Sequence, residues 1–197
     1  MKLILASASP RRAEVLRNAG FVFDVQPANV DETRQPGEDA GKYVQRVAKA
    51  KGDAIQAAAL PYGPAIVIAA DTVVVAGGEV LPKPKDVDDA RRMLKLLNAT
   101  THDVLTGLYV IRVYDGISFA RLEKTSVEFT RLSDLDIENY LATKEPFDKA
   151  GAYGIQGIGG RFVRGIDGCY FNVMGLPVSR LWSILREMRW EDDPRTA

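Results

Sequence analysis

Hydrophobic and polar positions along the chain follow two periods, one typical of strands and one typical of helices. Three short segments predict strands over residues 3–6, 21–26 and 65–70; the second alternates, and the last is apolar at every position. A continuous apolar run of this length indicates a strand that is buried on both faces. Two longer segments, 102–113 and 117–130, predict a pair of strands joined by a tight turn.

Helical spacing of apolar residues separates these strands. The predicted helices cover residues 10–18, 38–59, 86–97, 133–143 and 176–189. Ser9, Asp86 and Ser133 are suited to cap the helices that follow them. Segment 145–160 is interrupted by glycines and predicts irregular structure, while 191–197 is expected to be a frayed tail. The alternation predicts one α/β domain with a mixed sheet that spans residues 1–197.

Composition narrows the function classes. Hydrophobic residues make up 46% of the 197 residues and charged residues 26%, as in ordinary globular proteins. Because 26 basic residues balance 26 acidic ones, we expect neither a nucleic-acid binder nor a membrane-surface binder. The single cysteine, Cys169, excludes an intrachain disulfide, and the sequence contains no pattern of a signal peptide or a membrane span. We therefore expect a cytoplasmic protein.

The first strand leads into small hydroxyl residues, a proline and two adjacent arginines. Ser7 and Ser9 would lie with the N-terminus of the first helix at one end of the strand, beside Arg11 and Arg12. Hydroxyls, backbone N–H groups and guanidinium groups are the usual partners of phosphate. The alternative is an ordinary strand-to-helix turn with two solvated arginines.

Acidic candidates follow two other predicted strands. Asp71 comes directly after the buried run 65–70, where an open α/β sheet presents side chains to a ligand. A carboxylate there can activate water or hold a divalent metal, or it can simply cap a turn. Glu32, next to Asp31, lies in a polar loop after the second strand and is the other candidate for a site carboxylate. The alternative interpretation is that this loop is an ordinary solvated turn.

Two further segments have the chemistry of a nucleotide site. Lys83 and Lys85 alternate with prolines on a stiff loop, and ammonium groups held on such a loop are suited to bind phosphate oxygens. The alternative, which is more common for a lysine pair, is that both are solvated surface residues. In segment 148–157, Gln156 can hydrogen-bond to the edge of a base, and Tyr153 can pack on a ring or a ribose. One histidine and one cysteine cannot form a typical zinc site, and we interpret His102 as structural.

Taken together, these segments resemble the Maf family of nucleoside triphosphate pyrophosphatases. The resemblance extends over nearly the whole chain and is carried by residues 7–12, 31–32, 48–51, 70–73, 83–86, 101–107, 145–157 and 175–177. Within the family, the sequence most resembles the dTTP/UTP pyrophosphatase branch. The mark of that branch is Asp-Lys-Ala-Gly-Ala-Tyr-Gly-Ile-Gln-Gly, here residues 148–157, together with Arg12. The family implies a twisted mixed sheet with flanking helices, two-lobed around a central cleft, as in Maf and ITPase-like folds.

The resemblance also implies an activity and roles for particular residues. It implies hydrolysis of dTTP and UTP to the monophosphate and pyrophosphate with Mg²⁺ or Mn²⁺, and CTP or modified pyrimidine nucleotides are further candidate substrates. The implied general base is Asp71, and a metal would be held by Glu32 or Asp71. The implied phosphate ligands are Ser7, Ser9, Arg11, Arg12, Lys51 and Lys83, and the residues for base choice are Arg12, Thr72 and Gln156.

The sequence leaves open alternatives for the function and for the oligomeric state. The family has been associated with septum formation, so the alternative function is a nucleotide-binding regulator of cell division without significant turnover. The family also allows a homodimer. A house-cleaning role on non-standard nucleotides is a further enzymatic alternative.

Overall fold

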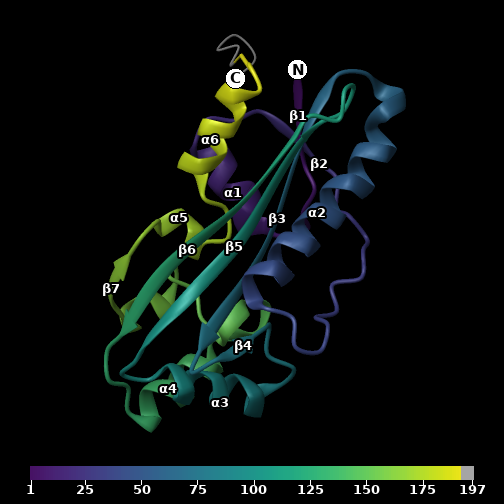
Figure 1. Cartoon of the computed structure of the whole chain (residues 1–197). Coiled ribbons are helices and arrows are strands. Elements are labelled where there is room, and N and C mark those ends of the chain that lie inside the picture. Colours follow the sequence, from purple (N-terminus) through teal and green to yellow (C-terminus); the bar gives the residue numbers. More distant parts are fainter. Residues whose placement is uncertain (192–197) are drawn as a thin grey trace. The chain divides into compact units, whose positions relative to one another are not determined.

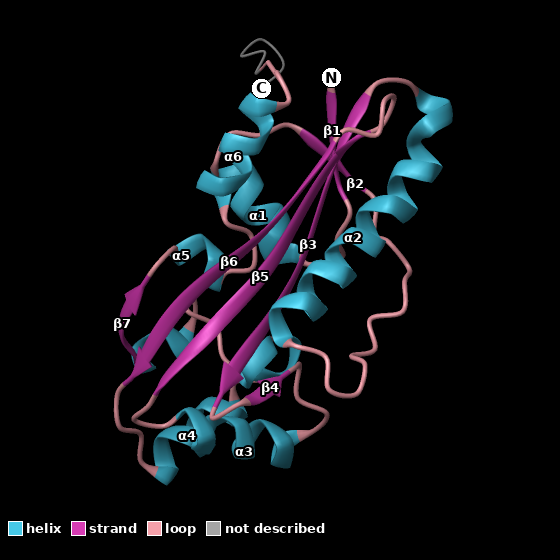
Figure 2. Cartoon of the chain, in the orientation of Figure 1, coloured by secondary structure: helices cyan, strands magenta, loops and turns pink. Residues whose placement is uncertain are grey.

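The computed structural model describes residues 1–191, which divide into two compact units. Unit 1 consists of Met1–Asp71, Thr106–Glu123 and the chain from Gly175 onward, and unit 2 of Thr72–Leu105 and Lys124–Met174. The strands are β1 (Lys2–Leu5), β2 (Phe23–Val25), β3 (Ala65–Ala76), β4 (Glu79–Leu81), β5 (Thr101–Arg112), β6 (Ser118–Phe129) and β7 (Val163–Asp167). The α-helices are α1 (Pro10–Asn18), α2 (Ala40–Ala59), α3 (Val87–Leu97), α4 (Asp134–Ala142), α5 (Tyr170–Val173) and α6 (Val178–Glu187) (Figures 1 and 2).

The described strands form one mixed sheet. Their order is β2-β1-β3-β5-β6-β7, with β4 paired to β3. In unit 1, β1 is parallel to both β2 and β3, with Leu5 opposite Ile68. In unit 2, the β3–β4 and β6–β7 pairs are antiparallel. The α/β fold with a mixed sheet and flanking helices is thus confirmed.

In unit 1, helix α2 packs on the sheet through an apolar stripe. Ala48 and Ile55 of α2 share a buried cluster with Val67, Ala69 and neighbouring strand residues. Figure 1 shows α2 on one side of these strands, with α1 and α6 on the other. Helices on both sides explain why the first half of β3 is apolar at every position.

Close approach between α2 and β5 depends on two glycines. A Cβ on Gly107 of β5 would lie 2.4 Å from the backbone oxygen of Val44 in α2. A Cβ on Gly52 of α2 would lie 2.4 Å from the ring of Tyr109 in β5. Any larger side chain at Gly107 must therefore move the helix or the strand backbone.

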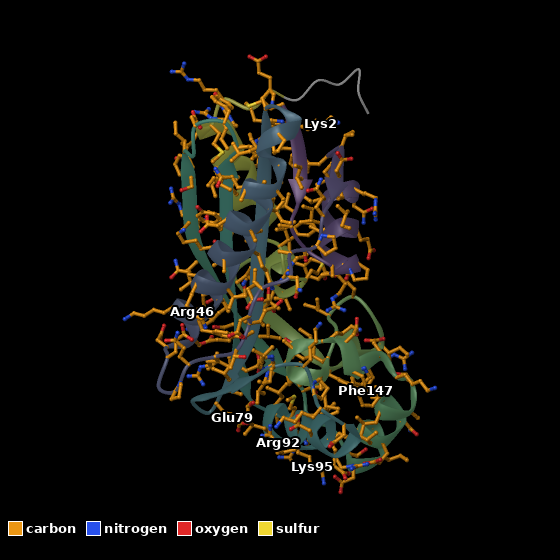
Figure 3. The ribbon with its side chains drawn as sticks, turned by 90° about the vertical axis from the view of Figure 1, so that its right-hand side faces the viewer. Lys2, Arg46, Glu79, Arg92, Lys95 and Phe147 are labelled. Atoms are coloured by element: carbon orange, nitrogen blue, oxygen red, sulfur yellow. The ribbon has the colours of Figure 1, made fainter. Side chains whose placement is uncertain are left out.

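Unit 2 has its own core, formed by α3, α4, the strands and the 3-10 turns of segment 145–162. The Gly77-Gly78 turn between β3 and β4 has φ angles of 56° and 82°, which glycine adopts without strain. Ser133 begins α4 with a capping box, in which its hydroxyl and the Asp136 carboxylate bond each other's backbone N–H groups. Arg92 of α3 pairs with Glu79 of β4 at 2.7 Å, and Figure 3 labels both.

Several predicted boundaries differ from those in the structure. The predicted helix 176–189 begins only at Val178, because Gly175 has φ 100° and Pro177 occupies the N-cap position. Strand β7 was not predicted from its short sequence, and it forms through pairing with β6. Most of the predicted frayed tail, residues 192–197, lies outside the described residues. None of the helices within residues 1–191 is long and apolar enough to cross a membrane.

Candidate functional site

The centre of the candidate site in unit 1 is an ammonium group between two carboxylates. Lys51 Nζ lies 2.8 Å from Asp71 Oδ1 and 2.9 Å from Glu32 Oε2. The side chains of Lys51 and Asp71 are only 8% and 10% exposed, whereas that of Glu32 is 50% exposed. One side of this triad is thus buried in the protein, and the Glu32 side is open to solvent.

Asp71 lies within a strand, which corrects the prediction that it follows one. Strand β3 continues to Ala76 because the apolar residues after Asp71 pair with β4. The neighbouring strand β1 ends at Leu5, which pairs with Ile68. Asp71 therefore lies beyond the carboxyl end of β1, and the ammonium of Lys51 from α2 compensates its buried charge.

Ser7 and Arg12 are brought together directly after β1. Ser7 Oγ accepts a hydrogen bond from Arg12 Nη1 at 3.1 Å and another from the backbone N–H of Ser9 at 3.2 Å. Arg12 Nε donates to the carbonyl oxygen of Gly175 at 2.8 Å. Ser9 is the N-cap residue of α1, as predicted, but its side chain makes no capping hydrogen bond. The Arg12 guanidinium is thus held in one orientation by its contacts.

Electrostatics connect Arg12 to the carboxylate pair. Burial lowers the pKa of Arg12 below its ordinary value, the negative charges of Asp71 and Glu32 oppose this, and the positive charge of Arg11 adds to it. Arg12 therefore lies within the electrostatic field of both carboxylates. Arg11 is partly exposed, while Arg12 is 9% exposed. Arg12, Lys51 and the two carboxylates belong to one charged site in unit 1.

The loop that carries Glu32 is anchored on α2 by residues that sequence reasoning missed. The Tyr43 hydroxyl donates to the backbone oxygen of Glu32 at 2.8 Å. Arg46 donates to the backbone oxygen of Thr33 and forms two hydrogen bonds to the Glu38 carboxylate, at 2.7 and 2.9 Å. Figure 3 shows Arg46 extending from α2 beside this loop.

The Arg46 guanidinium lowers the pKa of the Glu38 carboxyl to about 2. Both groups therefore stay charged through the neutral range. The available sequence signal for this anchor was the helical spacing of Tyr43 and Arg46, three residues apart, which places both on one face of α2.

Three predicted site residues belong to unit 2. Thr72 is partly buried on β3, while Lys83 and Gln156 are exposed. The structure therefore leaves Lys83 and Gln156 accessible to a ligand. Their predicted roles, and that of Thr72, stay predictions.

Tyr153 is a core residue, which corrects its prediction as a group that packs on a base or ribose. It is 5% exposed, and its hydroxyl lies 2.8 Å from Nε2 of His102. Its ring packs edge-on against Phe129 at a centroid distance of 4.7 Å. The structural role predicted for His102 is confirmed, because that side chain is buried with Tyr153 in the core of unit 2.

A separate hollow of about 370 Å³ in unit 2 contains none of the predicted site residues. It is lined by α4 and the 3-10 turn Ile158–Phe162, together with Thr130, Arg131 and Leu132. The predicted chemistry therefore does not depend on this hollow.

The carboxylate pair has the donor chemistry of a magnesium or manganese site. Within residues 1–191 no group of three or more histidine, cysteine or acidic side chains gathers to hold a metal. Mg²⁺ commonly binds through one or two carboxylates and completes its coordination with waters and substrate phosphates. Glu32 and Asp71 fit that pattern, and a full protein cage is not required.

The fold and site define a mixed α/β protein in which a buried lysine bridges one buried and one exposed carboxylate, next to a buried arginine. The profile of the family described as "Maf-like protein" matches residues 2–188. The chain therefore belongs to the Maf family.

Three relatives support this assignment along nearly their whole length. The chain is 48% identical to a dTTP/UTP pyrophosphatase of Koribacter versatilis (strain Ellin345), with 94% of both chains covered. It is 47% identical to a dTTP/UTP pyrophosphatase of Anaeromyxobacter dehalogenans (strain 2CP-C), covering 96% of this chain and 97% of the relative. A dTTP/UTP pyrophosphatase of Clostridium perfringens (strain ATCC 13124) is 48% identical, with 94% and 96% covered.

A solved structure also matches over most of its length. It is a nucleoside-triphosphatase / dITP/XTP pyrophosphatase from Mycobacterium abscessus, 12% identical, with 96% of both chains covered and a TM-score of 0.39. That similarity is too low to support an argument about fold or function.

Proposed function

We propose that this protein hydrolyses the pyrimidine nucleotides dTTP and UTP to the nucleoside monophosphate and pyrophosphate. The observation that carries the proposal is the Lys51 ammonium held between the Asp71 and Glu32 carboxylates, within the field of buried Arg12. Relatives that are nearly half identical over almost the whole chain are named dTTP/UTP pyrophosphatases, which supports the same activity. Their names favour hydrolysis over the alternative of a regulator without turnover.

The cations of unit 1 are suited to bind a triphosphate. Arg12 is fixed by Ser7 and Gly175, so its guanidinium loses little conformational freedom when it binds phosphate oxygens. Arg11 supplies a second guanidinium at the N-terminus of α1, where the helix dipole also favours negative charge. Lys51 adds a third positive charge.

Asp71 is proposed to take the proton from the attacking water. The water oxygen bonds to the α-phosphorus, the bond from that phosphorus to the bridging oxygen breaks, and pyrophosphate leaves with the bridging oxygen. The hydrogen bond from Lys51 fixes the direction of the Asp71 carboxylate. In such reactions positioning and charge stabilisation supply most of the rate enhancement.

Glu32 and Asp71 would hold the divalent cation, Mg²⁺ or Mn²⁺, that this chemistry uses. When bound, the cation supplies neutralisation of the phosphate charge. The Tyr43 and Arg46 contacts to the Glu32 loop position the more exposed carboxylate for this task. A cation held by these two carboxylates would need no further protein ligand, since Mg²⁺ commonly binds through only one or two carboxylates.

Base choice is assigned to Gln156, with Arg12 and Thr72, on the family resemblance. The exposed amide of Gln156 can donate to and accept from the edge of uracil or thymine. CTP, whose base edge has a different donor and acceptor pattern, is a weaker candidate. The predicted homodimer and cytoplasmic location stay predictions.

The test is a substrate panel. Purified protein is incubated with dTTP, UTP, CTP, GTP or 7-methyl-GTP, with Mg²⁺, with Mn²⁺ or with EDTA, and the released pyrophosphate and nucleoside monophosphate are quantified. We expect equal amounts of both products from dTTP and UTP, a loss of turnover in EDTA, and slower turnover of the purine nucleotides. Nucleotide binding without pyrophosphate release would refute the enzyme and support the regulator, and a purine preference would refute the pyrimidine assignment.

A further inference from the structure

The carboxylate of Glu145 is a centre of hydrogen bonds inside unit 2. Glu145 Oε1 accepts from the Tyr140 hydroxyl at 2.9 Å and from the backbone N–H of Gly159 at 3.2 Å. Glu145 Oε2 accepts from the backbone N–H of Ile158 at 2.9 Å. The Tyr140 hydroxyl in turn accepts from the backbone N–H of Gly154 at 3.2 Å. One carboxylate thus holds the glycine-rich segment 154–159 at three backbone positions, one of them through Tyr140.

The glycines of this segment lie against the same carboxylate and its partner hydroxyl. A Cβ on Gly157 would lie 2.4 Å from Oε2 and 2.5 Å from Oε1 of Glu145. A Cβ on Gly159 would lie 2.6 Å from the Tyr140 hydroxyl oxygen. Since real Cβ atoms do not approach so closely, the segment reaches Glu145 only because these positions are glycine.

Gln156 lies between these anchors. The backbone N–H of Gly157 is 3.4 Å from the carbonyl oxygen of Gly154, which closes a turn with Gln156 as its third residue. Gly154 is held by Tyr140 before Gln156, and Ile158 is held by Glu145 after it. The direction of the exposed Gln156 amide is therefore set by a turn that is held at Gly154 and at the following residue Ile158 by one partly buried network.

The charge of Glu145 suits this arrangement. Burial alone would raise the pKa of the Glu145 carboxyl, but the N–H groups of Ile158 and Gly159, the Tyr140 hydroxyl and nearby Lys149 outweigh it and hold that pKa below its usual range. Burial and the Glu145 charge raise the pKa of Tyr140, so its hydroxyl remains a donor. Glu145 is thus an ionised acceptor facing three donors, the combination in which charge-assisted hydrogen bonds are strongest.

We propose that Glu145 is a positioning residue for base selectivity, which holds the Gly154–Gly157 turn so that Gln156 presents its amide to the pyrimidine. This inference rests on the proposed function, because it needs Gln156 to contact the base. Glu145 itself touches neither substrate nor reacting atoms. Its effect on the reaction is transmitted through the backbone of the turn.

The test is a double-mutant cycle on selectivity, defined as kcat/KM for dTTP divided by kcat/KM for GTP. Glu145→Gln keeps the size of the side chain but places an NH2 group against one of the three donors. We expect the selectivity of Glu145→Gln and of Gln156→Ala to fall about tenfold or more, mainly through KM for dTTP. The double variant should lose no more selectivity than Gln156→Ala alone.

Two further variants separate positioning from general stability. Glu138→Gln removes an exposed carboxylate of unit 2 that pairs with Arg91, and it should leave selectivity unchanged. If Glu145→Gln does not fold, Tyr140→Phe provides the same test, since it removes one donor to Glu145 and keeps the ring that packs against Phe162. Tyr140→Phe should lower selectivity in the same direction by a smaller factor.

The outcomes are distinct. Wild-type selectivity in the Glu145 or Tyr140 variant, or losses that add in the double variant, would overturn the positioning role. A lower melting temperature with equal losses on dTTP and GTP would assign Glu145 a structural role only, which also overturns the proposal. A wild-type protein that releases no pyrophosphate from any nucleotide would instead refute the proposed function beneath it.

Discussion

His102 is predicted to stay neutral far below the pH at which a histidine normally takes up a proton. Its side chain is 2% exposed and packs edge-on against Phe129 and Tyr153 at centroid distances of 4.9 and 5.3 Å. Nε2 lies 2.8 Å from the Tyr153 hydroxyl, while Nδ1 is buried and has no hydrogen-bond partner among the described residues. Burial lowers the pKa of His102 from 6.5 to about 4, and the charge of Asp103 opposes only part of this.

The sign and size of the effect on stability follow from this pKa. Between pH 6.5 and about pH 4 the unfolded chain binds a proton at His102 that the folded protein excludes. Lowering the pH through this interval therefore destabilises the folded protein, and the effect levels off below about pH 4. At about 1.4 kcal/mol per pH unit, the free energy of unfolding decreases by about 3 kcal/mol over the whole interval. About 2 kcal/mol of this decrease occurs between about pH 7.5 and pH 5.

The assay benefits from the composition of the chain, because His102 is the only histidine. In untagged protein, the imidazole signals in an NMR pH titration belong to this residue without assignment. We expect no titration step between pH 8 and pH 5 and a midpoint near 4 or unfolding before it. A titration step in the folded protein near pH 6.5 would refute the burial argument. So would a His102→Asn variant whose unfolding free energy decreases as steeply as that of wild type when the pH is lowered from about 7.5 to about 5.

Three other predictions concern packing, charge and capping. Gly107→Ala should destabilise the protein by about 2 kcal/mol or more and lower its melting temperature in calorimetry by about 4 °C or more, because the added methyl group meets the backbone of α2. Gly165→Ala has open space around the added methyl group, so its melting temperature should stay near that of wild type. Lys51→Met should reduce kcat/KM for dTTP about 100-fold or more, whereas Lys49→Met, which removes an exposed lysine from the same helix, should leave it unchanged. Equal kcat/KM values for the two variants would contradict the role of Lys51 in the site. Ser133→Ala should lower the free energy of unfolding, measured by chemical denaturation, by about 1 kcal/mol because the helix cap is lost. A decrease below about 0.3 kcal/mol would contradict the capping argument.

Local signals in the sequence predicted much of the fold. Helix α1 begins at Pro10 and ends at Asn18 as predicted, because an N-terminal proline and a following glycine both act within a few residues. The capping role of Ser133 is confirmed for the same reason. Strand β7 depends on pairing with β6, a tertiary contact that its short sequence does not encode.

The candidate site was predictable in its chemistry and less so in its geometry. The strand-end position assigned to Asp71 was wrong, because a lysine from a distant helix makes a buried carboxylate tolerable within β3. Tyr153 was interpreted as a ligand group, although burial against His102 places it in the core. The spacing of Tyr43 and Arg46 places both on one face of α2, but it does not specify that the loop of Glu32 folds back onto that face.

The most direct test of the account compares Asp71→Asn with wild type at saturating dTTP, with pyrophosphate release and dTTP binding measured on the same preparations. Asparagine keeps the shape of the side chain and can still accept from Lys51, but it is a far weaker base. We expect kcat to fall about 100-fold to 10,000-fold with dTTP affinity changed little, and Asp53→Asn, which alters an aspartate paired with Lys49, to remain near wild type. A folded Asp71→Asn protein that releases pyrophosphate at the wild-type rate would contradict the account.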